Sequence, residues 1–129
     1  MMDYVIKLNS DNTIEIIEFP EGREFSWYSE QIGCEWIEIV RPKYSKYVLI
    51  VDEEGKLKDN HINLFASSMY GTFEHGDPIV GTCILMKEDF VDGEPDLVGM
   101  TYDEALKVKT ELDSQFENAN VFKRLTMEE

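Results

Sequence analysis

The sequence predicts an α+β domain built on a mostly antiparallel sheet of about five strands, with two or three helices packed on one face. Two observations carry this prediction. Apolar segments of strand length outnumber the helical patterns, and the two kinds of segment do not alternate as in a parallel βαβ fold. The 129 residues contain no repeat, linker or low-complexity segment, so we expect one domain over residues 1–129, with residues 118–129 as a C-terminal tail.

The N-terminal quarter predicts a hairpin followed by a short helix. Residues 4–8 and 13–19 are rich in strand-forming residues, and the polar residues between them have turn chemistry. The segment EFSWYSEQIG (residues 24–33) predicts a helix that Ser26 caps and Gly33 ends. We therefore expect the first two strands to pair with each other as a hairpin.

The middle of the chain predicts further strands over residues 34–40, 47–51 and 78–86. The second and third of these are almost continuously apolar, which is typical of buried strands. Between them, Asn60 or Asn63 caps a short helix that runs to about Tyr70. Gly81 inside the last strand indicates a bulge or a close approach of another backbone.

The final helix has the clearest local pattern. Thr101 and Glu104 form a capping box, and Asp103 favours the positive end of the helix dipole. One face of this helix is apolar and is predicted to pack on the core; it carries Ala105, Val108, Leu112 and Phe116.

The charge of the chain limits its partners. Twelve basic and 27 acidic residues give a net charge of −15, which disfavours direct binding to nucleic-acid phosphates and favours partners with basic surfaces. The charge is uneven, because residues 88–117 hold ten acidic and two basic residues. Such a segment can mimic a phosphate backbone, although ordinary solubility charge is the simpler interpretation.

Targeting and redox signals point to the cytoplasm, which would be the host-cell cytoplasm for a phage-encoded protein. The N-terminus lacks the pattern of a signal peptide, and no apolar run approaches the roughly 18 residues of a membrane span, so no membrane partner is expected. Cys34 and Cys83 are far apart in sequence and outside any CxxC motif, which favours two reduced thiols over a disulfide.

Motifs for catalysis and metal binding are missing from the sequence. No GxSxG, P-loop or GxGxxG motif occurs, and two histidines with two distant cysteines do not give zinc-ligand spacing. The acidic turn DEEG (residues 52–55) lacks the spacing of a calcium loop, so a solvated turn is favoured. We therefore expect no cofactor, no metal and no enzymatic activity.

Several segments together resemble the family known as domain of unknown function 3846, which occurs mainly in bacteriophages, plasmids and their bacterial hosts. The resemblance rests on the N-terminal hairpin, IGCEWIEIV (residues 32–40), VDEEGKLK (51–58), Asn63 with Ala66 and Tyr70, DPIVGT (77–82) and the capping-box helix. It implies a fold and a genomic setting, and no catalytic residues. A viral or plasmid setting favours proteins that bind and inhibit host machinery.

Our first functional hypothesis is a non-catalytic acidic binding protein of phage or mobile-element type. It would engage a host protein with a basic surface, such as a nucleic-acid-processing or defence protein, and antagonise it. The side chains expected to make this contact are the carboxylates of Asp89, Asp92, Glu94, Asp96, Asp103 and Glu104.

The alternative hypothesis belongs to a different class, a module that binds or sequesters a small nucleotide-like ligand, with a homo-oligomer left open. Polar and aromatic side chains can read the edges and faces of a flat ligand. The residues expected around such a pocket are Asn63, Tyr70, His61 and Trp36.

Overall fold

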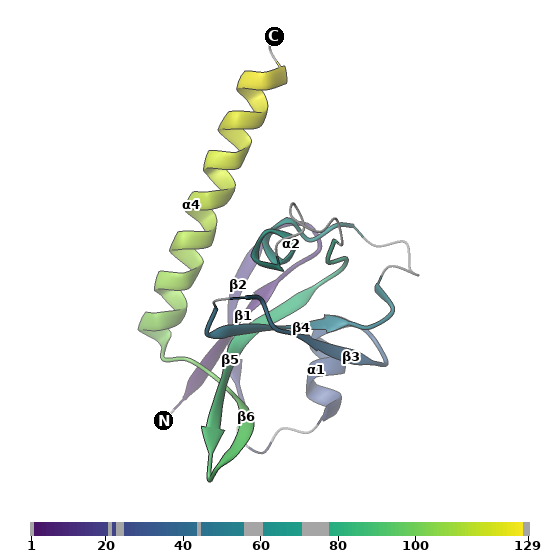
Figure 1. Ribbon diagram of the computed structural model, residues 1–129, viewed down its shortest axis with the longest axis vertical. Helices are drawn as coiled ribbons and strands as arrows, with labels where there is room; N and C mark the ends of the chain where they lie inside the picture. The colour runs from purple at the N-terminus through teal and green to yellow at the C-terminus, as the bar shows by residue number, and fades with distance from the viewer. Residues whose placement is uncertain are drawn as a thin grey trace.

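The computed structural model describes residues 2–20, 22, 25–43, 45–55, 61–70 and 78–127, with side chains up to residue 115. Within these ranges six strands form one antiparallel sheet, in the order β2-β1-β5-β4-β3, with β6 paired to β5 (Figure 1). The strands are β1 (Asp3–Leu8), β2 (Ile14–Phe19), β3 (Ile37–Val40), β4 (Tyr47–Asp52), β5 (Cys83–Val91) and β6 (Glu94–Val98). The helices are α1 (Phe25–Ile32), α2 (Leu64–Tyr70) and α4 (Tyr102–Met127). The predicted α+β class is confirmed.

Strand β5 lies at the centre of the sheet. Leu85 is paired with Ile6 of β1 on one side and with Leu49 of β4 on the other. The apolar runs of β4 and β5 place successive side chains on opposite faces of the sheet, so both faces of these strands are hydrophobic.

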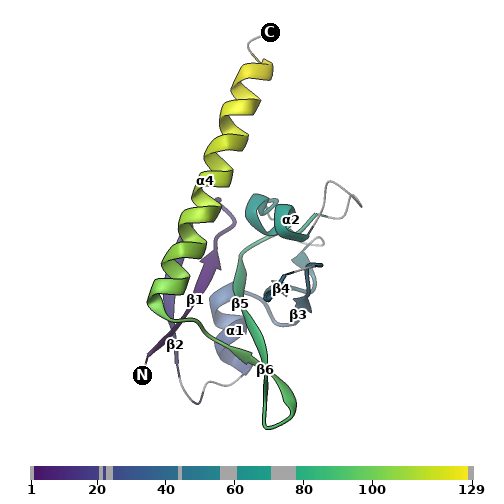
Figure 2. The ribbon, with the colours of Figure 1, turned by 60° about the vertical axis from the view of Figure 1, so that its left-hand side comes forward.

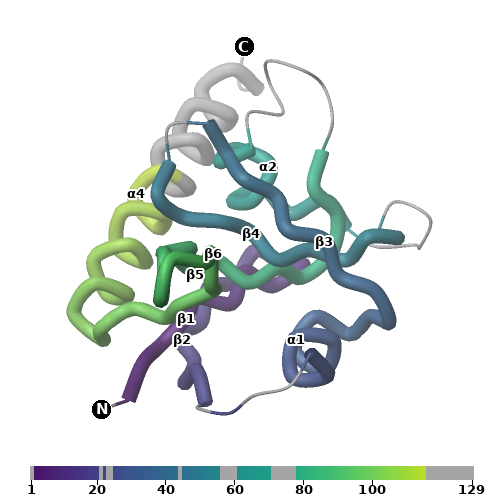
Figure 3. Tube along the Cα trace, turned by 60° about the horizontal axis from the view of Figure 1, so that its bottom comes forward, coloured from purple at the N-terminus to yellow at the C-terminus, as the bar shows by residue number. Residues whose placement is uncertain are grey.

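Each face of the sheet is covered by helices. On one face, residues such as Leu49 and Leu85 pack with α2 and with Ala105, Val108 and Leu112 of α4. On the other face, residues such as Ile50 and Ile84 pack with Tyr28 and Ile32 of α1. Figure 3 shows α1 on one side of the sheet and α2 and α4 on the other. The expectation that the helices pack on one face is therefore wrong, because a sheet that is apolar on both faces needs cover on both.

Two helix starts differ in how well they were predicted. Helix α1 begins at Phe25, so Ser26 is its second residue rather than its cap. Asn63 does cap α2, because its Oδ1 atom accepts the backbone N–H of Ala66 at 3.1 Å. Asn60, the alternative cap, lies outside the described residues.

Helix α4 is longer than expected. Its range, Tyr102–Met127, includes residue 118, where the sequence predicted that a tail begins. Ala105, Val108 and Leu112 are buried as the spacing predicts, and the side chain of Phe116 lies outside the described part of the chain.

Candidate functional site

A two-stranded hairpin formed by β5 and β6 extends beyond the rest of the sheet. Strand β5 is paired with β1 as far as Leu85 and with β4 as far as Lys87, whereas its pairing with β6 runs from Lys87 to Val91. Figures 1 and 2 both show the hairpin leaving the body of the protein. In the prediction from sequence, this strand ends at residue 86 and β6 does not appear.

The hairpin is closed by a two-residue turn, Asp92–Gly93. Both residues have positive φ, 53° at Asp92 and 81° at Gly93, which is the requirement of a type I′ turn. Asp and Gly adopt this conformation with little strain. The turn sets the register, in which Val91 is paired with Glu94, Phe90 with Pro95 and Asp89 with Asp96.

One face of the hairpin is acidic. Asp89 and Asp96 lie directly opposite each other. Glu94 precedes Asp96 by two residues and therefore lies on the same face, and Asp92 is in the turn. All four side chains are exposed. Directly opposed like charges destabilise an antiparallel pair, so this arrangement carries a small cost in folding stability.

The other face of the hairpin is apolar towards its tip. Phe90 and its cross-strand neighbour Pro95 lie on this face, and Phe90 is 73% exposed. Nearer the body, Leu97 lies on the same face and packs against the core that contains α1. The hairpin thus presents carboxylates on one side and an exposed aromatic ring on the other.

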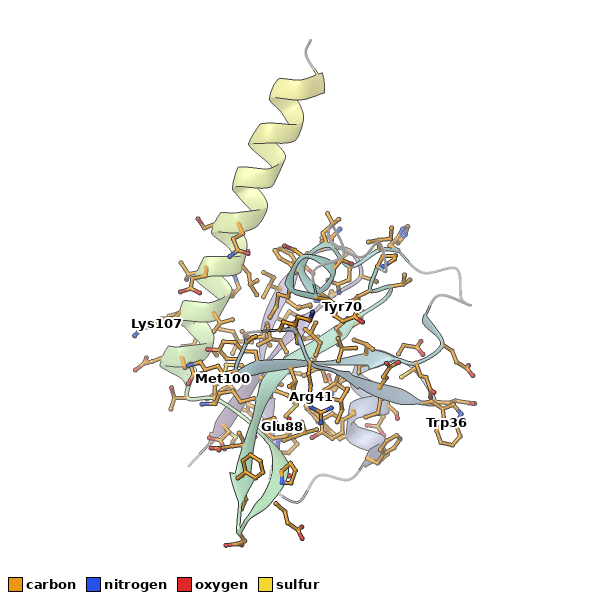
Figure 4. All side chains as sticks on the ribbon, viewed as in Figure 1. Trp36, Arg41, Tyr70, Glu88, Met100 and Lys107 are labelled. Carbon is orange, nitrogen blue, oxygen red and sulfur yellow. The ribbon has the colours of Figure 1, made fainter. Side chains whose placement is uncertain are left out.

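Two contacts fix the base of the hairpin to the body. Glu88 is held by Arg41 through two hydrogen bonds of 2.9 and 2.7 Å, and the two side chains meet in Figure 4. This bidentate bond lowers the pKa of Glu88 and raises the pKa of Arg41. Beyond β6, Met100 exchanges two backbone hydrogen bonds of 2.8 Å with Tyr4. The adjoining Gly99 has no space for a side chain, since a Cβ atom there would lie 2.8 Å from that of Asp3.

Glu104, one of the predicted binding residues, is engaged within the protein. Its carboxylate accepts hydrogen bonds from Tyr47 Oη at 3.0 Å and Lys87 Nζ at 3.1 Å, and Lys46 Nζ lies 3.9 Å away. Burial would raise the pKa of Glu104, but the hydrogen bonds from Lys87 and Tyr47 outweigh burial and lower it. Burial, together with the bond to Glu104, raises the pKa of Tyr47 to about 12. Only half of the predicted capping box forms, in which Thr101 Oγ1 accepts the Glu104 N–H at 3.1 Å.

The six predicted protein-binding residues therefore form two groups. Asp89, Asp92, Glu94 and Asp96 share the hairpin, whereas Asp103 and Glu104 lie in the first turn of α4. Asp103 is exposed, while the half-buried Glu104 connects α4 to the sheet.

Asn63, a predicted ligand-binding residue, is fully buried and bonded to the protein itself. Its Nδ2 atom donates to the backbone oxygens of Leu8 and Gly81, both at 2.9 Å, and lies 3.7 Å from the sulfur of Cys83. Cys83 is a buried free thiol, and burial raises its pKa to about 12. Asn63 thus connects the start of α2 to β1 and to the segment that leads into β5.

The other three predicted ligand-binding residues are not brought together with it. Trp36 is 58% exposed before β3, and His61 is exposed before α2. Tyr70 lines a cavity of about 130 Å³ with Glu38, Asp52 and other residues, but Trp36 and His61 do not line it. Figure 4 shows Trp36 and Tyr70 well apart. The described residues therefore offer no shared pocket to this set.

Metal and membrane features give no further candidate site in the described parts of the chain. No group of three or more His, Cys, Asp or Glu side chains could hold a metal ion there. In the DEEG turn, Asp52 is buried, and its Oδ1 atom accepts the N–H of Glu54 at 2.9 Å. Among the described helices, none has both the length and the apolar character needed to cross a membrane.

Comparisons with known proteins concern the fold and the family. The structure is similar to the crystal structure of the small RNA methyltransferase HEN1, with a TM-score of 0.50 and 15% sequence identity. The aligned part covers 79% of this chain and 15% of that chain, and at this identity the likeness concerns the fold alone. None of the curated proteins matches. The model of the family described as "Domain of unknown function (DUF3846)" matches residues 2–112, from the start of β1 into α4. This match spans most of the chain and agrees with the motifs seen in the sequence, and the chain therefore belongs to the DUF3846 family.

Proposed function

We propose that this protein is a non-catalytic acidic binding protein that uses the β5–β6 hairpin to dock onto a basic surface of another protein. The observation that carries the proposal is the position of four exposed carboxylates on one projecting hairpin, those of Asp89, Asp92, Glu94 and Asp96. Among the described residues, none makes an ion pair with any of these four. Their charge therefore remains available to a partner.

The contrast with the base of the hairpin supports this proposal. Glu88 and Glu104 have cations beside them, Arg41 for the first and Lys87 for the second, so their charges act inside the protein. The four hairpin carboxylates lie farther from the body and would add to the field of a chain whose net charge is −15. A field of this sign speeds association with basic surfaces and opposes association with nucleic-acid phosphates.

The family setting suggests which proteins such a surface would engage. Proteins that bind DNA or RNA have basic surfaces, because Lys and Arg neutralise phosphates and release counterions. A nucleic-acid-processing or defence protein of the host cell, met in the cytoplasm, is the target class that we propose. Occupation of its basic channel by the hairpin would antagonise nucleic-acid binding.

The proposal is tested by capture from a lysate of the cells in which the protein is made. Purified protein is immobilised, and the retained proteins are identified by mass spectrometry at about 50 mM and about 500 mM salt, where charge screening differs strongly. We expect a basic protein to be retained at low salt and released at high salt. Retention that does not change with salt, or no retention at low salt, contradicts the proposal.

Two charge variants show whether the hairpin itself is responsible. The test variant combines Asp89→Asn, Asp92→Asn, Glu94→Gln and Asp96→Asn. A control variant removes four exposed carboxylates from other parts of the structure through Glu18→Gln, Glu30→Gln, Glu35→Gln and Glu54→Gln. Both lose the same net charge, so a hairpin interface predicts that affinity falls at least about tenfold for the first variant and little for the second. Equal losses would mean that net charge alone attracts the partner.

A further inference from the structure

Phe90 has the largest exposed fraction among the large apolar side chains that the structure describes, 73%. It does not stand alone, because Pro95, which is also exposed, lies opposite it on the same face. Val91, its neighbour in sequence, is 46% exposed but lies on the acidic face. A single exposed apolar residue on a flat surface needs no explanation, but an exposed aromatic ring beside an exposed proline at the tip of a projecting hairpin forms a small apolar surface.

The register separates this apolar surface from the acidic one. Side chains alternate along each strand, so Phe90 and Pro95 lie on one face, while Asp89, Asp96 and Glu94 lie on the other. The two surfaces are the opposite sides of the same two strands, so they lie close together. A partner that receives the tip would meet both kinds of side chain at once.

The outer edge of β6 does not favour recognition through strand addition. In a hairpin with a two-residue turn, the pair that closes the turn is hydrogen-bonded and the next pair is not. Val91 and Glu94 are the closing pair here, and Phe90 and Pro95 are the next, so the nitrogen of Pro95 faces away from β5. Proline has no N–H to offer an added strand, and exposed carboxylates also discourage edge-to-edge pairing. On the outer edge of β5, which has no partner strand beyond Lys87, the N–H of Phe90 is already bonded to Asp89 Oδ1 at 2.8 Å. Recognition through side chains at the tip is therefore favoured over strand addition for this hairpin.

We propose that Phe90 is the anchor of the interface, and that it enters an apolar pocket on the partner protein whose rim carries Lys or Arg side chains. This inference rests on the proposed function and deepens it, because it names the chemistry of the partner's surface. The acidic residues would supply attraction and orientation, and they match a cationic rim in charge. Phe90 would supply affinity, since aromatic side chains buried at the centre of an interface carry most of the binding energy. A second copy of this chain is a poor occupant, because two acidic hairpins repel each other.

The test places a photo-crosslinker at the proposed anchor. Phe90 is replaced by p-benzoylphenylalanine, which keeps an aromatic side chain, and the control carries the same group at Leu106, an exposed position on α4. Both proteins are irradiated in the low-salt lysate. We expect position 90, and not position 106, to form an adduct with the protein that the wild type retains in a salt-dependent way. An adduct with a second copy of this chain overturns the inference.

Binding kinetics with the retained protein, once purified, give the second readout. We expect Phe90→Ala to weaken binding about tenfold or more through faster dissociation, with the salt dependence kept. The hairpin charge variant should instead associate more slowly and show a weaker salt dependence than the wild type. Phe90→Leu should retain part of the affinity, and Leu106→Ala should retain all of it.

The outcomes separate this inference from the proposed function. If Phe90→Ala binds as tightly as the wild type while the charge variant loses affinity, Phe90 is not the anchor and the acidic interface stands. If no protein is retained at low salt, the proposed function fails and this inference fails with it. The exposed position of Phe90 means that thermal unfolding of Phe90→Ala should match that of the wild type, which excludes misfolding as the cause of lost binding.

Discussion

The two halves of strand β5 have opposite environments. Cys83, Ile84, Leu85 and Met86 are each 0% exposed, whereas Asp89, Phe90 and Val91 are exposed. The first half has strands on both sides and helices over both faces; the second half has only β6 as a neighbour beyond Lys87. Folding stability therefore depends on the first half. The second half can hold residues that favour binding at small cost to the fold.

The largest expected effect comes from substituting one residue in each half of the strand. Leu85→Ala should lower the free energy of unfolding by about 3 kcal/mol, because it leaves a cavity at the centre of the sheet. Phe90→Ala should change it by less than about 0.5 kcal/mol, since the ring is mostly in water. Urea denaturation followed by circular dichroism measures both values. Similar losses for the two variants would mean that the hairpin is part of the cooperative core.

Asn63 gives the next largest effect, because it connects the buried half of β5 to its surroundings through a polar side chain. Asn63→Ala removes the cap of α2, which is worth about 1 kcal/mol, and removes the amide donor from the buried oxygens of Leu8 and Gly81. The Gly81 oxygen then keeps only the weak bond from Cys83 Sγ at 3.5 Å. We expect a total loss of about 2–3 kcal/mol in urea denaturation.

Two variants sharpen the interpretation of that loss. Asn63→Asp keeps an oxygen for the cap but offers no amide donor, so it should also destabilise the protein. Asn9→Ala, at a residue whose side chain makes exposed hydrogen bonds to Thr13 and Glu15, should cost less than about 0.5 kcal/mol. If Asn63→Ala has the same free energy of unfolding as the wild type, the buried oxygens find other partners.

The sequence predicted the buried half of β5 better than the exposed half, for a physical reason. A continuous apolar run such as residues 83–86 is a strong local signal, and so are the turn and strand residues of the first hairpin. The exposed half contains charged residues that have low strand propensity. The Asp92–Gly93 pair is a known hairpin signal and could have indicated β6, but its acidic surroundings suggested a charged surface segment instead.

The candidate site was predictable in composition but not in arrangement. The acidic residues are visible in the sequence, whereas their division between the hairpin and α4 depends on strand pairing. The capture of Glu104 by Tyr47 and Lys87 joins residues 57 and 17 positions apart, which no local pattern indicates. The sequence indicates two roles for Asn63, as a helix cap and as a ligand contact. The structure confirms the cap, and it places the side chain in the core, where it is fully buried.

Lys87 lies between the two halves of β5 and connects the strand to α4 through Glu104. Substitution of Glu104 therefore measures how much this connection stabilises the fold. Glu104→Gln weakens the bonds to Lys87 and Tyr47 and should cost about 1 kcal/mol at neutral pH. The pKa of Glu104 is lowered from its ordinary value of 4.5 in the folded protein. Its contribution is therefore present above that value and is lost as the pH falls through the lowered pKa.

The measurement is the difference in unfolding free energy between wild type and Glu104→Gln at pH 7 and again near pH 3. We expect the difference to shrink at the lower pH. Glu111→Gln, an exposed position on the same helix, is the control and should show little effect at either pH. A difference that grows on acidification would contradict the lowered pKa.

The smallest expected effect lies on the acidic face of the exposed half. Asp89→Asn combined with Asp96→Asn removes two like charges that face each other, so it should stabilise the protein by about 0.3 kcal/mol in low salt. The gain should disappear in high salt, because screening already weakens the repulsion in the wild type. Glu18→Gln, which faces Tyr4 across β1 and β2, removes a carboxylate without an opposed partner and should give no such gain. If the double variant is more stable and also binds its partner less well, the opposed pair is kept for binding and not for folding.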